Sequence, residues 1–207
     1  KYYQKLKLTE IIGKLKSKGI NLDKLVKGMT TFKIEHNLSI NKCGEWINQP
    51  HILNQFQLQS FNERTLYRAL EILGQNKELV IGNIANKLFS KYKFKQTDSI
   101  LDWSSLVLYG NASPLGKYGY SSDRRPDKKQ FVFGIGTLSK PIDVPFMLTI
   151  NAGNVPSKTH FTDTFERSAK HLKDGSLIIF DRGANTKDNK SLIRSKFMHY
   201  LTARKLS

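Results

Sequence analysis

Two aspartates, Asp102 and Asp181, are the residues whose type and setting in this sequence could do chemistry. Asp102 lies within a segment of strand-forming residues, and Asp181 ends the apolar segment Ser176–Phe180. If the two segments are parallel neighbours in a sheet, both carboxylates emerge at the same end of it. A carboxylate at the tip of a buried strand is costly unless it is paired or binds a cation. Two such carboxylates repel each other unless a divalent ion lies between them.

The pattern therefore predicts a site for Mg²⁺ or Mn²⁺, because hard divalent cations prefer carboxylate oxygens, retained water and phosphate oxygens. Two such ions roughly 3.5–4 Å apart would activate a water or a 3′-hydroxyl and stabilise the leaving oxygen of a phosphodiester. An alternative for Asp181 taken alone is a turn residue before Arg182-Gly183. The alternative is weaker once Asp102 is considered, because a second carboxylate is then expected at the same end of the sheet.

The elements that would position these aspartates occupy residues 96–207. We expect three strands joined by turns, then a crossover helix, a strand, a second helix and a last strand. The predicted elements are the strands Ser99–Tyr109, Gln130–Leu138 and Val144–Asn151, the helix Thr159–Leu172, the strand Ser176–Asp181, the helix Thr186–Phe197 and the strand His199–Ala203. This order is that of an α/β, RNase H-like fold. In that fold an antiparallel three-strand meander is followed by parallel strands with crossover helices.

Residues 1–95 have helical periodicity and are expected to form a separate helical N-terminal region, which is a candidate for DNA binding. Asn21, Ser39 and Asn62 are predicted helix caps, and Gly74 is expected to end the helix that Asn62 begins. A helix-turn-helix would present Arg64 and Arg68 to a DNA groove. The connection from residue 48 to 61 is long for that motif. An ordinary helical arm that packs on the core is therefore the favoured interpretation.

The composition points to a polyanionic partner. The 207 residues carry 34 Lys and Arg against 17 Asp and Glu, a formal net charge of +17. Residues 1–100 hold 17 basic and 8 acidic side chains, and residues 101–207 hold 17 and 9. Charge spread over both halves is typical of nucleic-acid binding; a Lys-rich proteome with solvated faces is the alternative. We expect no membrane span, no disulfide from the single Cys43, and a cytoplasmic, nucleoid-associated location.

Three stretches carry a resemblance to a known family. The first is Leu101–Leu106 around Asp102. The second is the run Gly119–Gln130, which is close to Gly-Tyr-Ser-Lys-Asp-x-Arg-Pro-Asp-x-x-Gln. The third is the Asp-Arg-Gly of residues 181–183. Together with the Gly153-Asn154 loop, they resemble DDE-type insertion-sequence transposases of the family-four type, which have an Asp-Asp-Glu triad on an RNase H-like fold.

The resemblance implies that Asp102 and Asp181 are the first two metal ligands of a Mg²⁺ or Mn²⁺ pair. The third ligand of the family is a Glu in a later helix with the pattern Tyr-x-x-Arg-x-x-x-Glu, and this sequence ends first. Glu166 lies on the crossover helix, the wrong element for that role. We therefore expect a chain cut off before its third carboxylate and inactive or nearly so alone. The implied partner is double-stranded DNA, at transposon ends and target, bound by a homodimer.

Basic side chains supply the remaining site predictions. In the run 119–130, Arg124, Arg125, Lys128 and Lys129 could neutralise phosphates while Tyr118 and Tyr120 offer stacking faces. Asp123 and Asp127 would orient the arginines or cap turns, and a plain solvated hairpin is the alternative. Arg182 would hold the scissile phosphate or pair with Asp181. His160, His171 and His199 have no metal-ligand spacing and are interpreted as structural.

Three functions compete at this stage. The first is a transposase that hydrolyses a phosphodiester at the element end, after which the freed 3′-hydroxyl attacks target DNA. The second is another RNase H-like DNA nuclease, which would lack the run 119–130 and would place its remaining acids within these residues. The third is a non-catalytic DNA-binding protein in which Asp102 and Asp181 are incidental.

Overall fold

The computed structural model describes residues 2–16, 18–110, 112–122, 124–139 and 143–204. Contacts divide the chain into two compact units, Lys1–Lys87 and Leu88–Ser207. The sequence predicted a division after residue 95. The predicted turn at 141–143 falls partly outside the described residues. Among the described helices, none combines the length and apolarity needed to cross a bilayer.

The helices of the first unit are α1 (Tyr2–Lys5), α2 (Leu8–Ile12), a 3-10 turn (Gly13–Leu15), α3 (Leu22–Glu35), α4 (Ile40–Ile47), α5 (Pro50–Phe56), α6 (Arg64–Gln75) and most of α7 (Lys77–Tyr92). Helices α2 to α6 surround one apolar core. Leu25, Phe32, Ile47 and Leu66 are fully or almost fully buried at its centre. Helical spacing of apolar residues places them on the inward faces of α3, α4 and α6.

The helix starts at residues 21 and 39 were predicted correctly. Asn21 Oδ1 accepts the Lys24 amide hydrogen at 3.0 Å, and Ser39 Oγ accepts that of Lys42 at 3.3 Å. The cap predicted at Asn62 is wrong, because α6 begins at Arg64 after Glu63 and the Asn62 side chain accepts the Thr65 hydroxyl rather than a backbone amide hydrogen. It is the backbone carbonyl of Asn62 that accepts the Thr65 amide hydrogen, at 2.9 Å.

The helix expected to stop before Gly74 continues to Gln75. The connection 48–61 is not a plain loop either, since it contains α5, whose first residue is Pro50. Proline suits the first position of a helix because its missing N–H would have no partner there.

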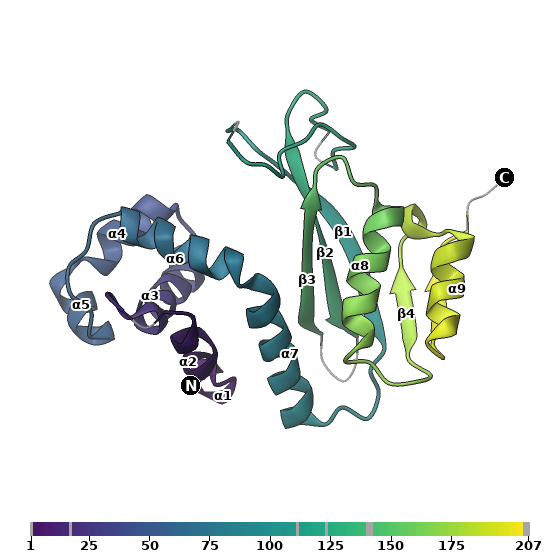
Figure 1. Cartoon of the computed structure of the whole chain (residues 1–207), viewed down its shortest axis with the longest axis horizontal. Helices are drawn as coiled ribbons and strands as arrows, with labels where there is room; N and C mark the ends of the chain where they lie inside the picture. The colour runs from purple at the N-terminus through teal and green to yellow at the C-terminus, as the bar shows by residue number, and fades with distance from the viewer. Residues whose placement is uncertain (1, 17, 111, 123, 140–142, 205–207) are drawn as a thin grey trace. The chain divides into compact units, whose positions relative to one another are not determined.

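The second unit holds a five-stranded mixed sheet, ordered β3-β2-β1-β4-β5 (Figure 1). Its strands are β1 (Ser99–Val107), β2 (Gln130–Leu138), β3 (Val144–Ala152), β4 (Leu177–Phe180) and β5 (His199–Thr202). β1, β2 and β3 form an antiparallel meander, and β4 lies parallel to both β1 and β5. The predicted RNase H-like fold is confirmed.

Helices α8 (Ser157–Ala169) and α9 (Lys187–Ser195) share one core with the sheet. Phe161 and Phe165 of α8 are fully buried against Leu101 of β1 and Ile178 of β4. This core occupies one face of the sheet. The alternate residues of β1, among them Ile100, Asp102 and Leu106, are exposed on the opposite face.

Candidate active site

The register of β1 and β4 brings the two predicted aspartates side by side. The last paired residues of these parallel strands are Leu101 and Phe180, both buried in the α8 core. Asp102 and Asp181 each follow directly, and the backbone of Asp181 is still extended. Neighbouring strands lie about 5 Å apart and in-register residues point to the same face. Both carboxylates therefore leave the sheet on the face opposite α8, and both side chains are exposed.

Local contacts hold each aspartate in place. The Asp102 carboxylate accepts the Trp103 amide hydrogen at 2.8 Å. The Asp181 carbonyl accepts the Thr202 hydroxyl at 3.2 Å, which ties the end of β4 to the end of β5. The chain then turns through the 3-10 segment Arg182–Ala184, where Gly183 packs against the Asp181 carboxylate. A β-carbon added at Gly183 would lie 3.1 Å from Asp181 Oδ2, so the turn leaves little room beside that oxygen.

These two carboxylates are a suitable but partial donor set for a hard divalent cation. Within the described ranges, no group of three or more His, Cys, Asp or Glu side chains lies close enough to hold a metal. Glu166 is exposed on α8, and that helix packs on the opposite face of the sheet from Asp102. Mg²⁺ is commonly held by one or two carboxylates together with water and substrate phosphates. The residues present therefore fit such an ion.

Arg182 lies beside the aspartates, in the first position of the turn that follows β4. Its side chain is exposed, and in the described part of the chain it forms no ion pair with Asp181. Of the two roles predicted for Arg182, pairing with the carboxylate is absent from this geometry. A guanidinium free at the end of β4 can donate to a phosphate.

The predicted basic run 119–130 belongs to a long excursion between β1 and β2. Gly119 packs so closely on the carbonyl of Gly153 that a β-carbon there would lie 2.1 Å from that oxygen. The buried Gln130 side chain donates to the carbonyls of Tyr120 at 2.5 Å and Gly153 at 3.2 Å. Ser122 Oγ and Ser105 Oγ of β1 lie 2.7 Å apart. The excursion is therefore anchored to the sheet at several points.

The four cations of this run differ in their surroundings. Arg125 donates two hydrogen bonds of 2.8 Å to Asp127. This bond lowers the pKa of Asp127 to about 2, and the carboxylate raises that of Arg125. Arg124 is exposed on a left-handed backbone, with φ 55°. Lys128 and Lys129 are half-buried, and Asp123 lies outside the described residues.

Arg64 and Arg68 stand on α6 of the helical unit, and both are exposed. Arg68 and Lys16 line an open groove of about 720 Å³ in that unit, with Gln57, Asn21 and other polar residues. A groove with two cations and several amides suits a polyanion better than an apolar ligand.

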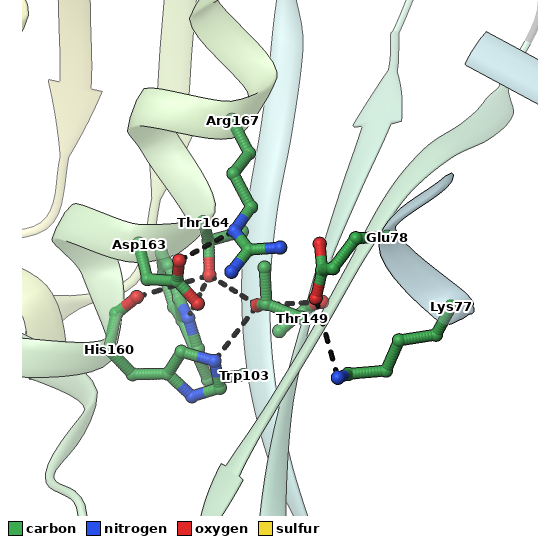
Figure 2. Close-up of polar contacts among 9 residues, drawn as sticks. Lys77, Glu78, Trp103, Thr149, His160, Asp163, Thr164 and Arg167 are labelled. Atoms are coloured by element: carbon green, nitrogen blue, oxygen red, sulfur yellow. Dashed lines mark hydrogen bonds and ion pairs between the residues drawn. The ribbon is translucent and has the colours of Figure 1, made fainter. Parts of the chain in front are cut away.

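A buried polar network lies between α8 and the sheet (Figure 2). The sequence did not predict it. The Thr149 hydroxyl of β3 lies 2.8 Å from both His160 Nε2 and the Thr164 hydroxyl on α8. Trp103 Nε1 donates to Thr164 at 3.0 Å. Burial lowers the pKa of His160 to about 4, so the ring is neutral at pH 7. This network is the physical basis of the structural role predicted for His160. The hydrogen bonds of the network fix α8 on the face of the sheet opposite the aspartates.

Comparison with protein-family models finds no match, and comparison with curated proteins finds none either. Solved structures are similar in fold. A piggyBac transposase synaptic complex with hairpin DNA aligns over 87% of this chain and 40% of its own, with 12% identity and a TM-score of 0.50. At this identity the likeness concerns the fold alone, which is transposase-like.

Two Mos1 transposase structures align with lower TM-scores. A paired-end complex with the left transposon end has 8% identity and a TM-score of 0.36, and a pre-cleavage transpososome has 10% and 0.33. Each alignment covers 90% of this chain and 60% of the Mos1 transposase chain. The chain thus spans less than two thirds of the length of each of these structures.

Proposed function

We propose that this chain forms part of the catalytic core of a DDE-type DNA transposase of the insertion-sequence family-four type. The observation that carries the proposal is the placement of Asp102 and Asp181 directly after the last in-register pair of β1 and β4. The run 119–130 and the Asp-Arg-Gly of residues 181–183 support the family, and the transposase-like fold supports the class.

In this proposal Asp102 and Asp181 hold a Mg²⁺ or Mn²⁺ pair that a third carboxylate, absent from the described residues, completes. When bound, such ions supply activation of the nucleophile and stabilisation of the leaving oxygen. Arg182 orients the scissile phosphate by charge-assisted hydrogen bonds from the end of β4. The reaction is hydrolysis of a phosphodiester at the element end, followed by attack of the freed 3′-hydroxyl on a phosphodiester of target DNA. The attack joins the element end to the target and releases a 3′-hydroxyl of the target strand.

The remaining basic residues bind double-stranded DNA. Arg124, Arg125, Lys128 and Lys129 contact phosphates from the catalytic core, which we assign to residues 96–207. Arg64 and Arg68 do so from the helical region, residues 1–95. Because phosphate contacts fix register rather than sequence, these residues position the DNA along the site. We further propose a homodimer on DNA and a cytoplasmic, nucleoid-associated location.

Calorimetric titration with Mn²⁺ and Mg²⁺ tests the metal site. We expect Asp102→Asn and Asp181→Asn each to weaken binding about tenfold or more, since each removes one of two anionic ligands. Asp188→Asn, an exposed carboxylate in the first turn of α9, is the matched control and should titrate like the unaltered chain. Broadening of the Trp103 and Arg182 amide signals by Mn²⁺ gives a second readout. If all four proteins titrate alike, the metal site and the transposase proposal are both wrong.

A non-catalytic DNA-binding protein is the second candidate. It is favoured by the finding that, within the described residues, no three His, Cys, Asp or Glu side chains lie close enough together to hold a metal ion. This candidate predicts DNA binding that neither divalent ions nor the two Asp→Asn substitutions alter.

A further inference from the structure

Three tyrosines on the excursion between β1 and β2 are unusually exposed. Tyr109, Tyr118 and Tyr120 have relative exposures of 81%, 61% and 92%. Exposed tyrosines carry large flat faces whose apolar area is left in water. Figure 1 shows the excursion projecting past the end of β1 and β2.

Backbone pairing gathers two of these tyrosines around a basic segment. The Leu108 amide donates to the Lys129 carbonyl at 2.8 Å, so Tyr109 follows a residue paired with the 128–130 segment. On the other side, Lys117 and Gln130 exchange two hydrogen bonds of 3.1 and 3.0 Å, and Tyr118 follows Lys117. The 128–130 segment therefore runs between the segments that carry Tyr109 and Tyr118.

The backbone under the third tyrosine is fixed as well. Gln130 Nε2 donates to the Tyr120 carbonyl, and Gly119 packs on Gly153. A side chain on a fixed backbone loses less conformational entropy on binding than one on a free loop. We call Tyr109, Tyr118, Tyr120, Lys128 and Lys129 the tyrosine ledge.

Cations accompany the rings of the ledge. Lys128 Nζ lies 5.9 Å from the centre of the Tyr109 ring, within the range of a cation–π contact. The segment 108–130 carries five basic and two acidic residues, so its net charge is positive. Flat aromatic faces interleaved with cations match a ligand that alternates flat bases with phosphates.

A duplex cannot use this surface fully, because its bases are stacked on one another and offer no free face. Unpaired nucleotides have both the free base face and the phosphate charge. We infer that the tyrosine ledge binds an unpaired stretch of a DNA strand, its bases stacked on the tyrosines and its phosphates on the lysines. The inference rests on the proposed function only in taking DNA as the ligand.

The test measures binding of the full chain to a fluorescent single-stranded oligonucleotide, and to a duplex of the same sequence, in EDTA. Replacing all three tyrosines by Ala should weaken single-strand binding about tenfold or more, because each stacked base is worth a severalfold factor. Duplex binding should change much less. Replacing them by Phe keeps the ring faces and should leave single-strand affinity nearly unchanged. An oligonucleotide containing 2-aminopurine should be quenched on binding to the Phe variant and not to the Ala variant.

Equal affinity of the Ala variant and the unaltered chain for the single strand would overturn the inference, as would an equal loss on duplex and single strand. So would the absence of single-strand binding by the unaltered chain. Asp188→Asn, an exposed carboxylate outside both proposed sites, is the control and should bind the single strand normally. Because this binding test is run in EDTA, a failed metal titration would not count against the tyrosine ledge, and a failed binding test would not count against the metal site.

Discussion

At the scale of single residues, the site depends on a crowded turn after β4. Gly183 leaves Asp181 Oδ2 just enough room, because an added β-carbon would lie 3.1 Å from that oxygen. We expect Gly183→Ala to turn the Asp181 carboxylate away from Asp102 and to weaken Mn²⁺ binding several-fold, in line with other perturbations of groups that orient metal ligands. Calorimetry measures the affinity and a thermal melt measures stability, which should stay close to that of the unaltered chain.

Gly110→Ala is the control for that substitution, since nothing lies within 4 Å of a β-carbon at Gly110. Its Mn²⁺ affinity should match that of the unaltered chain. If the Gly183 variant binds Mn²⁺ as tightly as the Gly110 variant, Asp181 is not a ligand held by this turn.

His160 makes a second prediction at this scale, on stability against pH. Its pKa is lowered by burial to about 4, against about 6.5 in an unfolded chain. The native state therefore binds fewer protons than the unfolded state between these values. Stability is complete above about pH 6.5 and falls with pH by up to about 1.4 kcal/mol per unit towards pH 4. Burial lowers the pKa of His171 in the same direction.

Urea melts across this pH range check the effect. A His160→Gln variant should be less stable at pH 7 and should lose much of the slope below pH 6.5, whereas His199→Gln, at an exposed position, should keep it. A slope that persists in the His160 variant would assign the acid sensitivity to other groups.

At the scale of elements, the strands and helices of the second unit follow from their sequence patterns. Apolar residues in β4 and the helical spacing of Phe161 and Phe165 predicted the parallel strand and the crossover helix, and both are present. These patterns sufficed because burial on one face fixes both the register of a strand and the face of a helix.

Other elements depend on contacts between distant residues that no local pattern contains. Asn48 donates to the carbonyls of Gly44 and Phe61 and accepts the Phe61 amide hydrogen, which folds the connection around α5. The approach of Gly119 to Gly153 is likewise tertiary. The neighbouring placement of Asp102 and Asp181 could be predicted because it needs only parallel pairing of two strands. The position of the tyrosine ledge could not be predicted, because it depends on such contacts between distant residues.

The packing of α8 on the sheet leads to a prediction at the scale of elements. A β-carbon at Gly134 of β2 would lie 2.6 Å from both the Thr164 hydroxyl and Trp103 Nε1. Gly134→Ala must push α8 away and break the Trp103–Thr164 hydrogen bond. We expect it to lower the free energy of unfolding by about 1–3 kcal/mol. Urea unfolding followed by Trp fluorescence measures the loss, and Gly110→Ala should show none. An equally stable Gly134 variant would mean that α8 is not packed tightly here.

At the scale of the whole molecule, the net charge of +17 is divided nearly evenly between the two halves. If both units contact one duplex, each contributes its own phosphate contacts. The logarithm of the binding constant then falls with the logarithm of salt concentration by about 0.9 for each contact. Arg64→Ala with Arg68→Ala, and Lys128→Ala with Lys129→Ala, should each weaken duplex binding and reduce this slope by up to about 2.

Fluorescence anisotropy at several salt concentrations measures both quantities. The four substitutions combined should reduce the slope by the sum of the two pairs, because the two pairs lie in separate compact units. The control is Lys14→Ala with Lys18→Ala, which removes the same charge at exposed positions outside the proposed contacts. If this control lowers the slope as much as either pair does, net charge alone governs binding. The assignment of Arg64, Arg68, Lys128 and Lys129 to a DNA path would then be wrong.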